Sequence, residues 1–106
     1  MSSNLAQSPD SDEPQALAAA YDEVPYISYP FPQTSPLWLQ GIARLFGLNA
    51  PSPATARILE IGCASGNNIV TIASIFPASQ CVGFDYSERQ IAMGKKAVKA
   101  AGLKNM

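Results

Sequence analysis

The sequence predicts an α/β fold built on a parallel sheet, and three observations carry this prediction. Two short strand-like runs, Arg57 to Ile61 and Cys81 to Asp85, are each followed by an apolar stretch with helical spacing. A tight loop with two glycines joins the first run to its helix. Because strand, helix, strand and helix alternate within about 50 residues, we expect right-handed crossovers between parallel strands.

Composition limits the chain to one ordinary domain and excludes several kinds of catalytic and binding site. It has 106 residues, 47% of them hydrophobic, and a net charge of −1, which gives no reason for attraction to nucleic acid or to an anionic membrane. Histidine is absent, so an imidazole base and a Ser-His-Asp relay are excluded within this sequence. Two cysteines predict neither a disulfide framework nor a metal site. Without a signal-peptide pattern or a long apolar run, we expect a cytoplasmic protein that does not enter membranes.

The first part of the chain is expected to contain a tail and a helix. Residues 1–13 are polar and acidic, and they offer little apolar surface to offset the entropy of ordering, so they predict a disordered tail. Residues 14–55 are expected to hold the N-terminal helices and an aromatic strap. A short helix is predicted over Gln15 to Tyr21, with Pro14 at its first position.

The aromatic strap is the segment from Val24 to Pro36, in which prolines alternate with aromatic residues. Proline excludes a regular helix and pushes its predecessor toward extended geometry. A helix from about Pro36 to Phe46 follows, with Ser35 as its N-cap and Gly47 as its stop. The strap's aromatic residues either cover a binding site or simply pack against the domain, and these are Tyr21 at its approach, Tyr26, Tyr29 and Phe31.

The last part of the chain, residues 56–106, carries the alternating strands and helices. After the first strand we expect a helix over the apolar stretch Ile69 to Phe76. After the second strand, Ser87 and Gln90 have the spacing of a capping box, and Gly102 is expected to end that helix.

The glycine loop is the first informative motif, with the spacing Gly62-x-x-x-Gly66 and Glu60 two positions before it. We expect its backbone N–H groups to point outward at the start of a helix and to hold a ligand closely. A nicotinamide or flavin fingerprint would need glycine at Ala64 and Asn67, and neither position has it. A phosphate-binding Walker loop would need lysine after its last glycine, and that reading fails too.

Asp85 is the second informative residue, because it stands at the carboxyl end of the second strand. In doubly wound sheets an acid there lies beside the glycine loop and accepts both hydroxyls of a ribose, which favours a nucleoside-containing cofactor. The alternative is that Asp85 only caps the turn into the next helix, although Ser87 already fits as the N-cap. Glu60 has a similar alternative role as a structural acceptor for loop N–H groups.

These residues resemble a known family. The stretches Ile58 to Asn67 and Val82 to Ser87, with Gln90 to Ala92 after them, are similar to class I S-adenosylmethionine-dependent methyltransferases. The likeness covers roughly Tyr21 to Met106, and the strap further resembles bacterial members that carry a downstream regulatory domain. The resemblance implies a Rossmann-like doubly wound sheet, of which residues 56–106 would be the first half.

The resemblance also implies roles for individual residues and S-adenosylmethionine as the cofactor. Gly62 and Gly66 would admit its methionyl part against bare backbone, and Glu60 would orient the loop and the ammonium group. Asp85 would take the ribose hydroxyls, and Tyr86 would flank the adenine. Two loop residues between the glycines complete the expected cofactor-binding set, namely Cys63 and Ala64. The family usually has glycine in place of Ala64.

Cys63 is expected to be a small loop residue without redox or nucleophilic chemistry. On parallel strands it should lie on the order of 15–20 Å from Cys81, and a disulfide needs less than about 7 Å between Cα atoms.

By the resemblance, the function is methyl transfer to an unidentified acceptor, either a small molecule or a protein, and this chain would supply the cofactor-binding half. No catalytic residue can be assigned, since acceptor-side residues would belong to the second half. The other partners considered are the missing C-terminal half and a regulatory domain. A non-catalytic module that binds the cofactor or a partner is one alternative, and a NAD-type half-domain is a less favoured one. With half the sheet absent, the first strand would have an unpaired edge.

Overall fold

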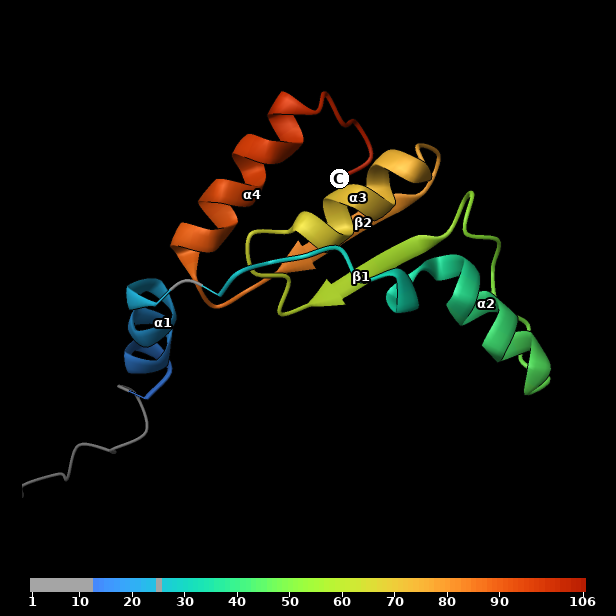
Figure 1. The fold of residues 1–106 in the computed structure, drawn as a ribbon, viewed down its shortest axis with the longest axis horizontal. Helices are drawn as coiled ribbons and strands as arrows, with labels where there is room; N and C mark the ends of the chain where they lie inside the picture. The colour runs from blue at the N-terminus through green and yellow to red at the C-terminus, as the bar shows by residue number, and fades with distance from the viewer. Residues whose placement is uncertain (1–12, 25) are drawn as a thin grey trace, which may run out of the picture.

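The computed structural model describes residues 13–24 and 26–106, and Figure 1 shows their arrangement. The predicted tail therefore lies outside the described residues, except Glu13, which begins the first helix. The elements are, in chain order, α1 (Glu13–Glu23), the short 3-10 helix η1 (Pro32–Thr34), α2 (Pro36–Leu45), β1 (Arg57–Ile61), α3 (Asn67–Ile75), β2 (Gln80–Phe84) and α4 (Glu88–Ala100). No helix in these described ranges is long and apolar enough to cross a membrane.

The sheet confirms the predicted α/β class. β1 and β2 run parallel, in a register that pairs Arg57 with Gln80 and Ile61 with Phe84, and α3 forms the crossover between them. The first strand has the predicted bounds, whereas the second begins and ends one residue earlier than expected. Asp85 consequently lies just beyond the end of β2, where the chain turns into α4.

A small core lies between the sheet and α3. Ile69 and Ala73 on α3 are fully buried, and they pack with Cys81 of β2. Side chains alternate between the two faces of a strand, so Cys81 and Gly83 of β2 both face this core. Gly83 lies so close to the loop that a Cβ placed there would be 2.9 Å from the Cys63 sulfur.

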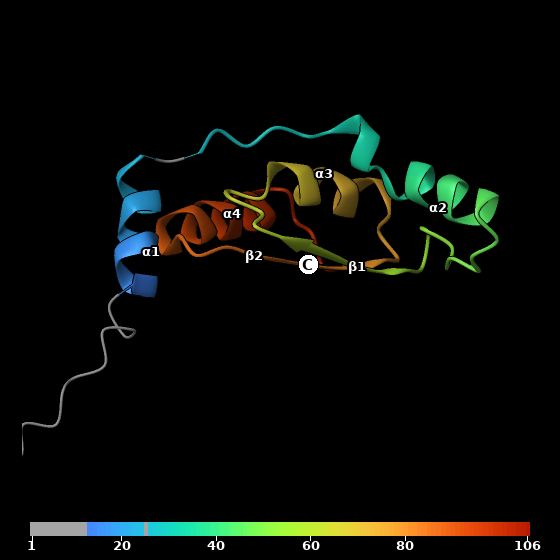
Figure 2. The ribbon, with the colours of Figure 1, turned by 90° about the horizontal axis from the view of Figure 1, so that it is seen from below.

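The opposite face of the sheet is bare. Figure 2 shows α3 on one side of the strands, and no described helix covers the other side. The side chains on the bare face are strongly exposed: Leu59 at 60%, Ile61 at 72%, Val82 at 57% and Phe84 at 51%. Parallel sheets are normally buried on both faces, whereas the described residues cover this sheet on one face only.

The helix ends agree with the predicted caps only in part. Ser87 caps α4 as expected, since its Oγ accepts a hydrogen bond from Gln90 N at 3.1 Å. The reciprocal half of the predicted capping box is absent, because the Gln90 side chain donates to Tyr26 O at 3.0 Å instead. Ser35 occupies the N-cap position of α2, but its side chain makes no capping bond. Gly47 adopts a φ of +79° after α2, as a helix-stopping glycine should.

The close contact at Gly83 generates a prediction for stability. Replacing Gly83 with alanine forces a Cβ against the Cys63 sulfur and within 3.3 Å of Ile69 Cγ2, so Gly83→Ala should lower the free energy of unfolding by about 1–3 kcal/mol. Gly41→Ala is the matched control, because that Cβ would meet nothing within 4 Å and alanine favours the helix. Urea unfolding of both variants checks this, and equal stabilities would contradict the packing described.

Candidate functional site

A pocket of about 480 Å³ lies at the carboxyl ends of β1 and β2, toward which both strand arrows point in Figure 1. This volume falls within the range of roughly 300–1,000 Å³ that is typical of small-molecule sites. The pocket is lined by the loop after β1, the turn after β2 and aromatic side chains of the strap; its residues are Tyr21, Tyr26, Phe31, Ile61, Gly62, Ala64, Phe84, Asp85, Tyr86 and Gln90.

In the loop between β1 and α3, every second residue from Gly62 to Gly66 adopts a left-handed backbone conformation. Gly62 has a φ of +70°, Ala64 of +50° and Gly66 of +80°. A Cβ on Gly62 would meet nothing within 4 Å, so the space beside this glycine belongs to the pocket. Ala64 adopts the geometry that glycine adopts more easily, at a cost of about 1–2 kcal/mol.

Four of the loop N–H groups donate to acceptors inside the protein and do not point outward, contrary to our expectation. Gly62 N and Cys63 N both donate to Phe84 O, at 2.9 and 3.0 Å. Gly66 N donates to Cys63 O at 2.8 Å, and Ala64 N donates to an Asp85 carboxylate oxygen at 2.8 Å. Because these donors are satisfied inside the protein, the loop is poorly suited to cradle phosphate, which further disfavours a dinucleotide or Walker-type site.

Asp85 joins the two turns that form the pocket. Its Oδ2 accepts from Ala64 N, and its Oδ1 accepts from Ser87 N at 2.9 Å, so the turn-capping role considered from the sequence is real. The carboxylate also lines the pocket. An ionised carboxylate has about four acceptor positions, so two remain for hydroxyl donors of a ligand. Capping and ligand binding are therefore compatible.

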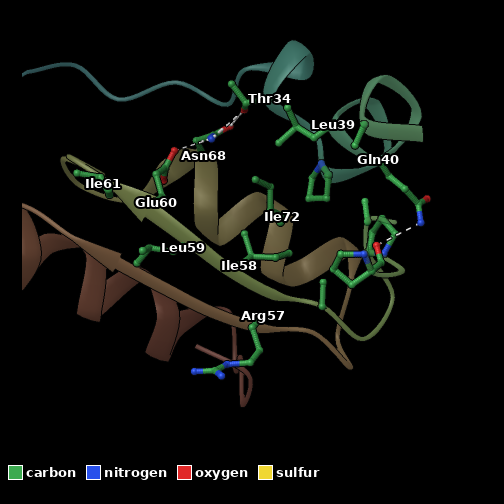
Figure 3. Close-up of a pocket in the computed structure, with 16 residues that line it drawn as sticks. Thr34, Leu39, Gln40, Arg57, Ile58, Leu59, Glu60, Ile61, Asn68 and Ile72 are labelled. Carbon is green, nitrogen blue, oxygen red and sulfur yellow. Dashed lines mark hydrogen bonds between the residues drawn. The ribbon is translucent and has the colours of Figure 1, made fainter. Parts of the chain in front are cut away.

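Glu60 lies away from this pocket. Its Oε1 accepts from Asn68 Nδ2 at 2.6 Å, while its Oε2 is buried and has no hydrogen-bond partner among the described residues. Figure 3 shows Glu60, Asn68 and Thr34 connected in a row above β1. Glu60 therefore acts as a structural acceptor for a side-chain amide, and among the described hydrogen bonds none joins it to the loop N–H groups.

The strap crosses the N-terminal ends of α3 and α4 through hydrogen bonds to its backbone. Phe31 N donates to Asn68 Oδ1 at 2.8 Å, and Asn67 Nδ2 donates to Ser28 O at 2.8 Å. Together with the bond from Gln90 to Tyr26 O, these contacts place the rings of Tyr26 and Phe31 at the pocket, and Tyr21 of α1 adds a third ring. Those rings line the pocket and remain substantially exposed, which favours the covering role over simple packing.

The residues that sequence reasoning missed are polar and hold this strap. Asn68 is 6% exposed and joins Glu60 to the strap, and Gln90 is 3% exposed. Asp22, at the end of α1, accepts from Ser87 Oγ, and Arg89 donates to its carbonyl at 3.2 Å. The paired asparagines after Gly66 were the available signal, but in the sequence analysis they helped only to exclude other loop types and to support the family resemblance.

Cys63 is buried in the core cluster with Cys81, and both thiols are free. Burial raises the pKa of the Cys63 thiol, and the neighbouring Asp85 and Glu60 carboxylates raise it further. A thiol with a raised pKa is a poor nucleophile at neutral pH, which agrees with the expected small structural role. Among residues 13–24 and 26–106, no group of His, Cys, Asp and Glu side chains is arranged to hold a metal ion.

The predicted cofactor-binding residues thus divide into two groups. Gly62, Ala64, Asp85 and Tyr86 line the pocket at the strand ends. The others do not: Glu60 faces Asn68, while Cys63 and Gly66 line a second cavity of about 340 Å³ between β2 and α4.

Comparison with known proteins identifies similar sequences. Residues 58–106 of this chain match the family described as a methyltransferase domain. The protein RP028 of Rickettsia prowazekii is 47% identical over 87 residues, which cover 82% of this chain and 35% of that protein. Trans-aconitate 2-methyltransferase of Variovorax paradoxus is 35% identical over 51 residues, which cover 48% of this chain and 20% of that enzyme.

Comparison with solved structures gives a match of the same kind. The structure of PKMT2 from Rickettsia typhi in complex with AdoHcy superposes with a TM-score of 0.71 and 43% identity, covering 76% of this chain and 16% of that chain. RP789 of Rickettsia prowazekii is 49% identical over 86 residues, 16% of its length. The chain therefore spans about a third or less of the length of these relatives.

The environment of Cys63 predicts its reaction with alkylating agents. Because burial and two carboxylates raise its pKa, the thiol stays protonated to higher pH in the folded chain than in the unfolded chain. The pH midpoint of Cys63 alkylation by iodoacetamide, followed by mass spectrometry, should therefore lie higher for folded protein than for protein in urea. A folded midpoint at or below the unfolded one would contradict this environment.

Proposed function

The chain belongs to the class I S-adenosylmethionine-dependent methyltransferases over residues 58–106, and from this premise we propose that it binds S-adenosylmethionine for methyl transfer to an acceptor. The pocket at the strand ends carries the proposal, because it combines a bare glycine, an oriented carboxylate and aromatic rings. The cofactor would supply the electrophilic methyl group. The solved structure of PKMT2 in complex with AdoHcy supports this choice of ligand.

The residues of the pocket fit the proposed cofactor. Asp85 is held by Ala64 N and Ser87 N, and its remaining acceptor positions suit the two hydroxyls of a ribose. The open space beside Gly62 would admit the chain that bears the sulfonium, and Tyr86, at the turn after β2, would flank the adenine. Because four of the loop N–H groups are already satisfied, a sulfonium nucleoside suits this site better than a phosphorylated dinucleotide.

The chain's contribution to methyl transfer would be to hold and orient the cofactor. Placing the acceptor in line with the reactive methyl is a large part of the acceleration available to such a reaction. The acceptor and its recognition residues would come from polypeptide beyond the described residues, since the relatives are much longer than this chain. A binding module without turnover is the alternative, and a transfer assay in the presence of the rest of the domain distinguishes the two.

A calorimetric titration tests the cofactor assignment. We expect S-adenosylhomocysteine to bind and NAD not to bind. Asp85→Ala removes hydrogen bonds between a charged acceptor and the ribose, so it should weaken S-adenosylhomocysteine binding by about 10- to 100-fold. Glu88→Ala is the control, because Glu88 is an exposed acid in the first turn of α4 and lies outside the pocket. Binding of NAD alone, or unchanged affinity in Asp85→Ala, would contradict the assignment.

A pair of glycine variants tests the pocket independently of charge. Gly62 and Gly47 have similar φ values, +70° and +79°, and a Cβ on either would meet nothing within 4 Å. Alanine at either position should therefore cost about 1–2 kcal/mol of stability through backbone strain. Only Gly62→Ala places its methyl in the pocket, so it alone should also weaken S-adenosylhomocysteine binding. Equal affinities of the two variants would show that the ligand lies elsewhere.

A further inference from the structure

Asn68 lies in the first turn of α3, and its side chain is almost fully buried, with 6% exposure. With Glu60 and Thr34 it lines a groove of about 510 Å³ along β1, and Figure 3 shows these three side chains in a row. A buried side-chain amide needs partners for its N–H groups and for its oxygen. The partners of Asn68 come from two different parts of the fold, the strand and the strap.

Both polar atoms of the Asn68 amide have partners. Its Nδ2 donates to Glu60 Oε1 at 2.6 Å and to Thr34 Oγ1 at 3.1 Å. Its Oδ1 accepts from Phe31 N at 2.8 Å. Phe31 is the N-cap residue of η1, and Thr34 is the last residue of that turn. One buried side chain therefore joins β1 to both ends of η1 in the strap.

Glu60 sets the orientation of this amide. A carboxylate oxygen accepts hydrogen bonds and cannot donate them, so the Nδ2 of Asn68 has to face Glu60 Oε1. The amide oxygen is then directed to the other side, where it accepts from Phe31 N. The reversed amide would place oxygen against oxygen at Glu60 and donor against donor at Phe31, so both bonds would be lost. The acceptor character of Glu60 thus determines how the strap is held.

The strap has little apolar burial to hold it in place. Its side chains Tyr26, Ile27 and Tyr29 are 65%, 67% and 59% exposed. Phe31 is 39% exposed, and its ring lines the pocket at the strand ends. Because burial contributes little here, the hydrogen bonds to the strap backbone carry most of the work of placing the Phe31 ring.

We propose that Asn68 is a positioning residue of the cofactor pocket, which holds Phe31 at the pocket by linking its backbone to the Glu60 carboxylate. The inference rests on the proposed function, because it takes the pocket at the strand ends to be the cofactor site. Asn68 is not among the residues that line this pocket, so it acts through Phe31 and does not touch the ligand. The apparent affinity for a ligand falls with the fraction of molecules in the binding-competent arrangement. Loosening the strap therefore weakens binding of the cofactor.

Calorimetric titration of Asn68→Ala with S-adenosylhomocysteine tests this role. The variant should bind about tenfold more weakly than the wild-type chain, because the strap loses its acceptor. Amide hydrogen exchange at Phe31, measured by NMR without ligand, should become faster in the same variant. Asn105→Ala is the matched control, since Asn105 Nδ2 also donates two hydrogen bonds, to Ala73 O and Phe76 O, at the opposite end of α3. The control should keep the affinity and the Phe31 exchange rate of the wild type.

Exchanging the two polar groups separates the direction of the hydrogen bonds from a simple loss of stability. Asn68→Asp alone places a second carboxylate against Glu60, so it should weaken binding more than Asn68→Ala does. Adding Glu60→Gln restores a donor at residue 60 and keeps an acceptor for Phe31 N at residue 68, with the net charge of the wild type. This double variant should recover the affinity to within about threefold of the wild type. If Asn68→Asp alone does not fold, the double variant is compared with Asn68→Ala.

Three results would overturn the inference while leaving the cofactor assignment intact. The first is unchanged affinity in Asn68→Ala, and the second is a folded double variant that binds no better than Asn68→Ala. The third is equal weakening in Asn68→Ala and Asn105→Ala, which would attribute the loss to general destabilisation. A wild-type chain that does not bind S-adenosylhomocysteine would contradict the cofactor assignment itself, and the inference would fall with it.

Discussion

The site depends on the hydrogen bonds that the carboxylate of Asp85 accepts from two backbone N–H groups. This carboxylate accepts from Ala64 N in the loop after β1 and from Ser87 N in the turn before α4, so one side chain fixes two turns that are distant in sequence. Hydrogen bonds to a charged group contribute about 1.5–3 kcal/mol each, which exceeds the cost of about 1–2 kcal/mol for holding Ala64 in left-handed backbone. This difference explains how the loop keeps its shape with alanine at a position that suits glycine.

The strap depends on a second set of contacts, made by side-chain amides. Asn67, Asn68 and Gln90 bind its backbone rather than its aromatic rings. Because the backbone is held in this way, the rings of Tyr26 and Phe31 remain free to line the pocket. Glu60 supports the same arrangement because its carboxylate accepts a hydrogen bond from Asn68. Glu60 therefore has a structural role next to the site.

The sequence was a good guide to local elements and a weaker one to polar contacts. β1 was predicted with the right bounds because its short β-branched run and the glycine that ends it are both local signals. The Ser87 cap was also correct, but its predicted partner, the Gln90 side chain, binds Tyr26 O. That contact joins residues far apart in the chain, and no local spacing encodes it. The inward direction of the loop N–H groups was missed for the same reason, since their acceptors, Phe84 O and Asp85, lie on the other strand's end. The helical spacing of apolar residues predicted α2, but none of the residues of this helix is buried.

The two described strands form a parallel pair, with the pocket at their carboxyl ends. A parallel pair of strands is only marginally stable on its own, and its bare face is where further polypeptide would add stability.

The central claim is that the pocket bounded by the loop, Asp85 and the strap is the cofactor site. The most direct measurement is NMR mapping of S-adenosylhomocysteine binding on the ¹⁵N-labelled chain. The account predicts chemical-shift changes at the amides of Gly62, Ala64, Asp85 and Tyr86 and in the strap. Changes confined to the cavity between β2 and α4, or to the groove along β1, would contradict it.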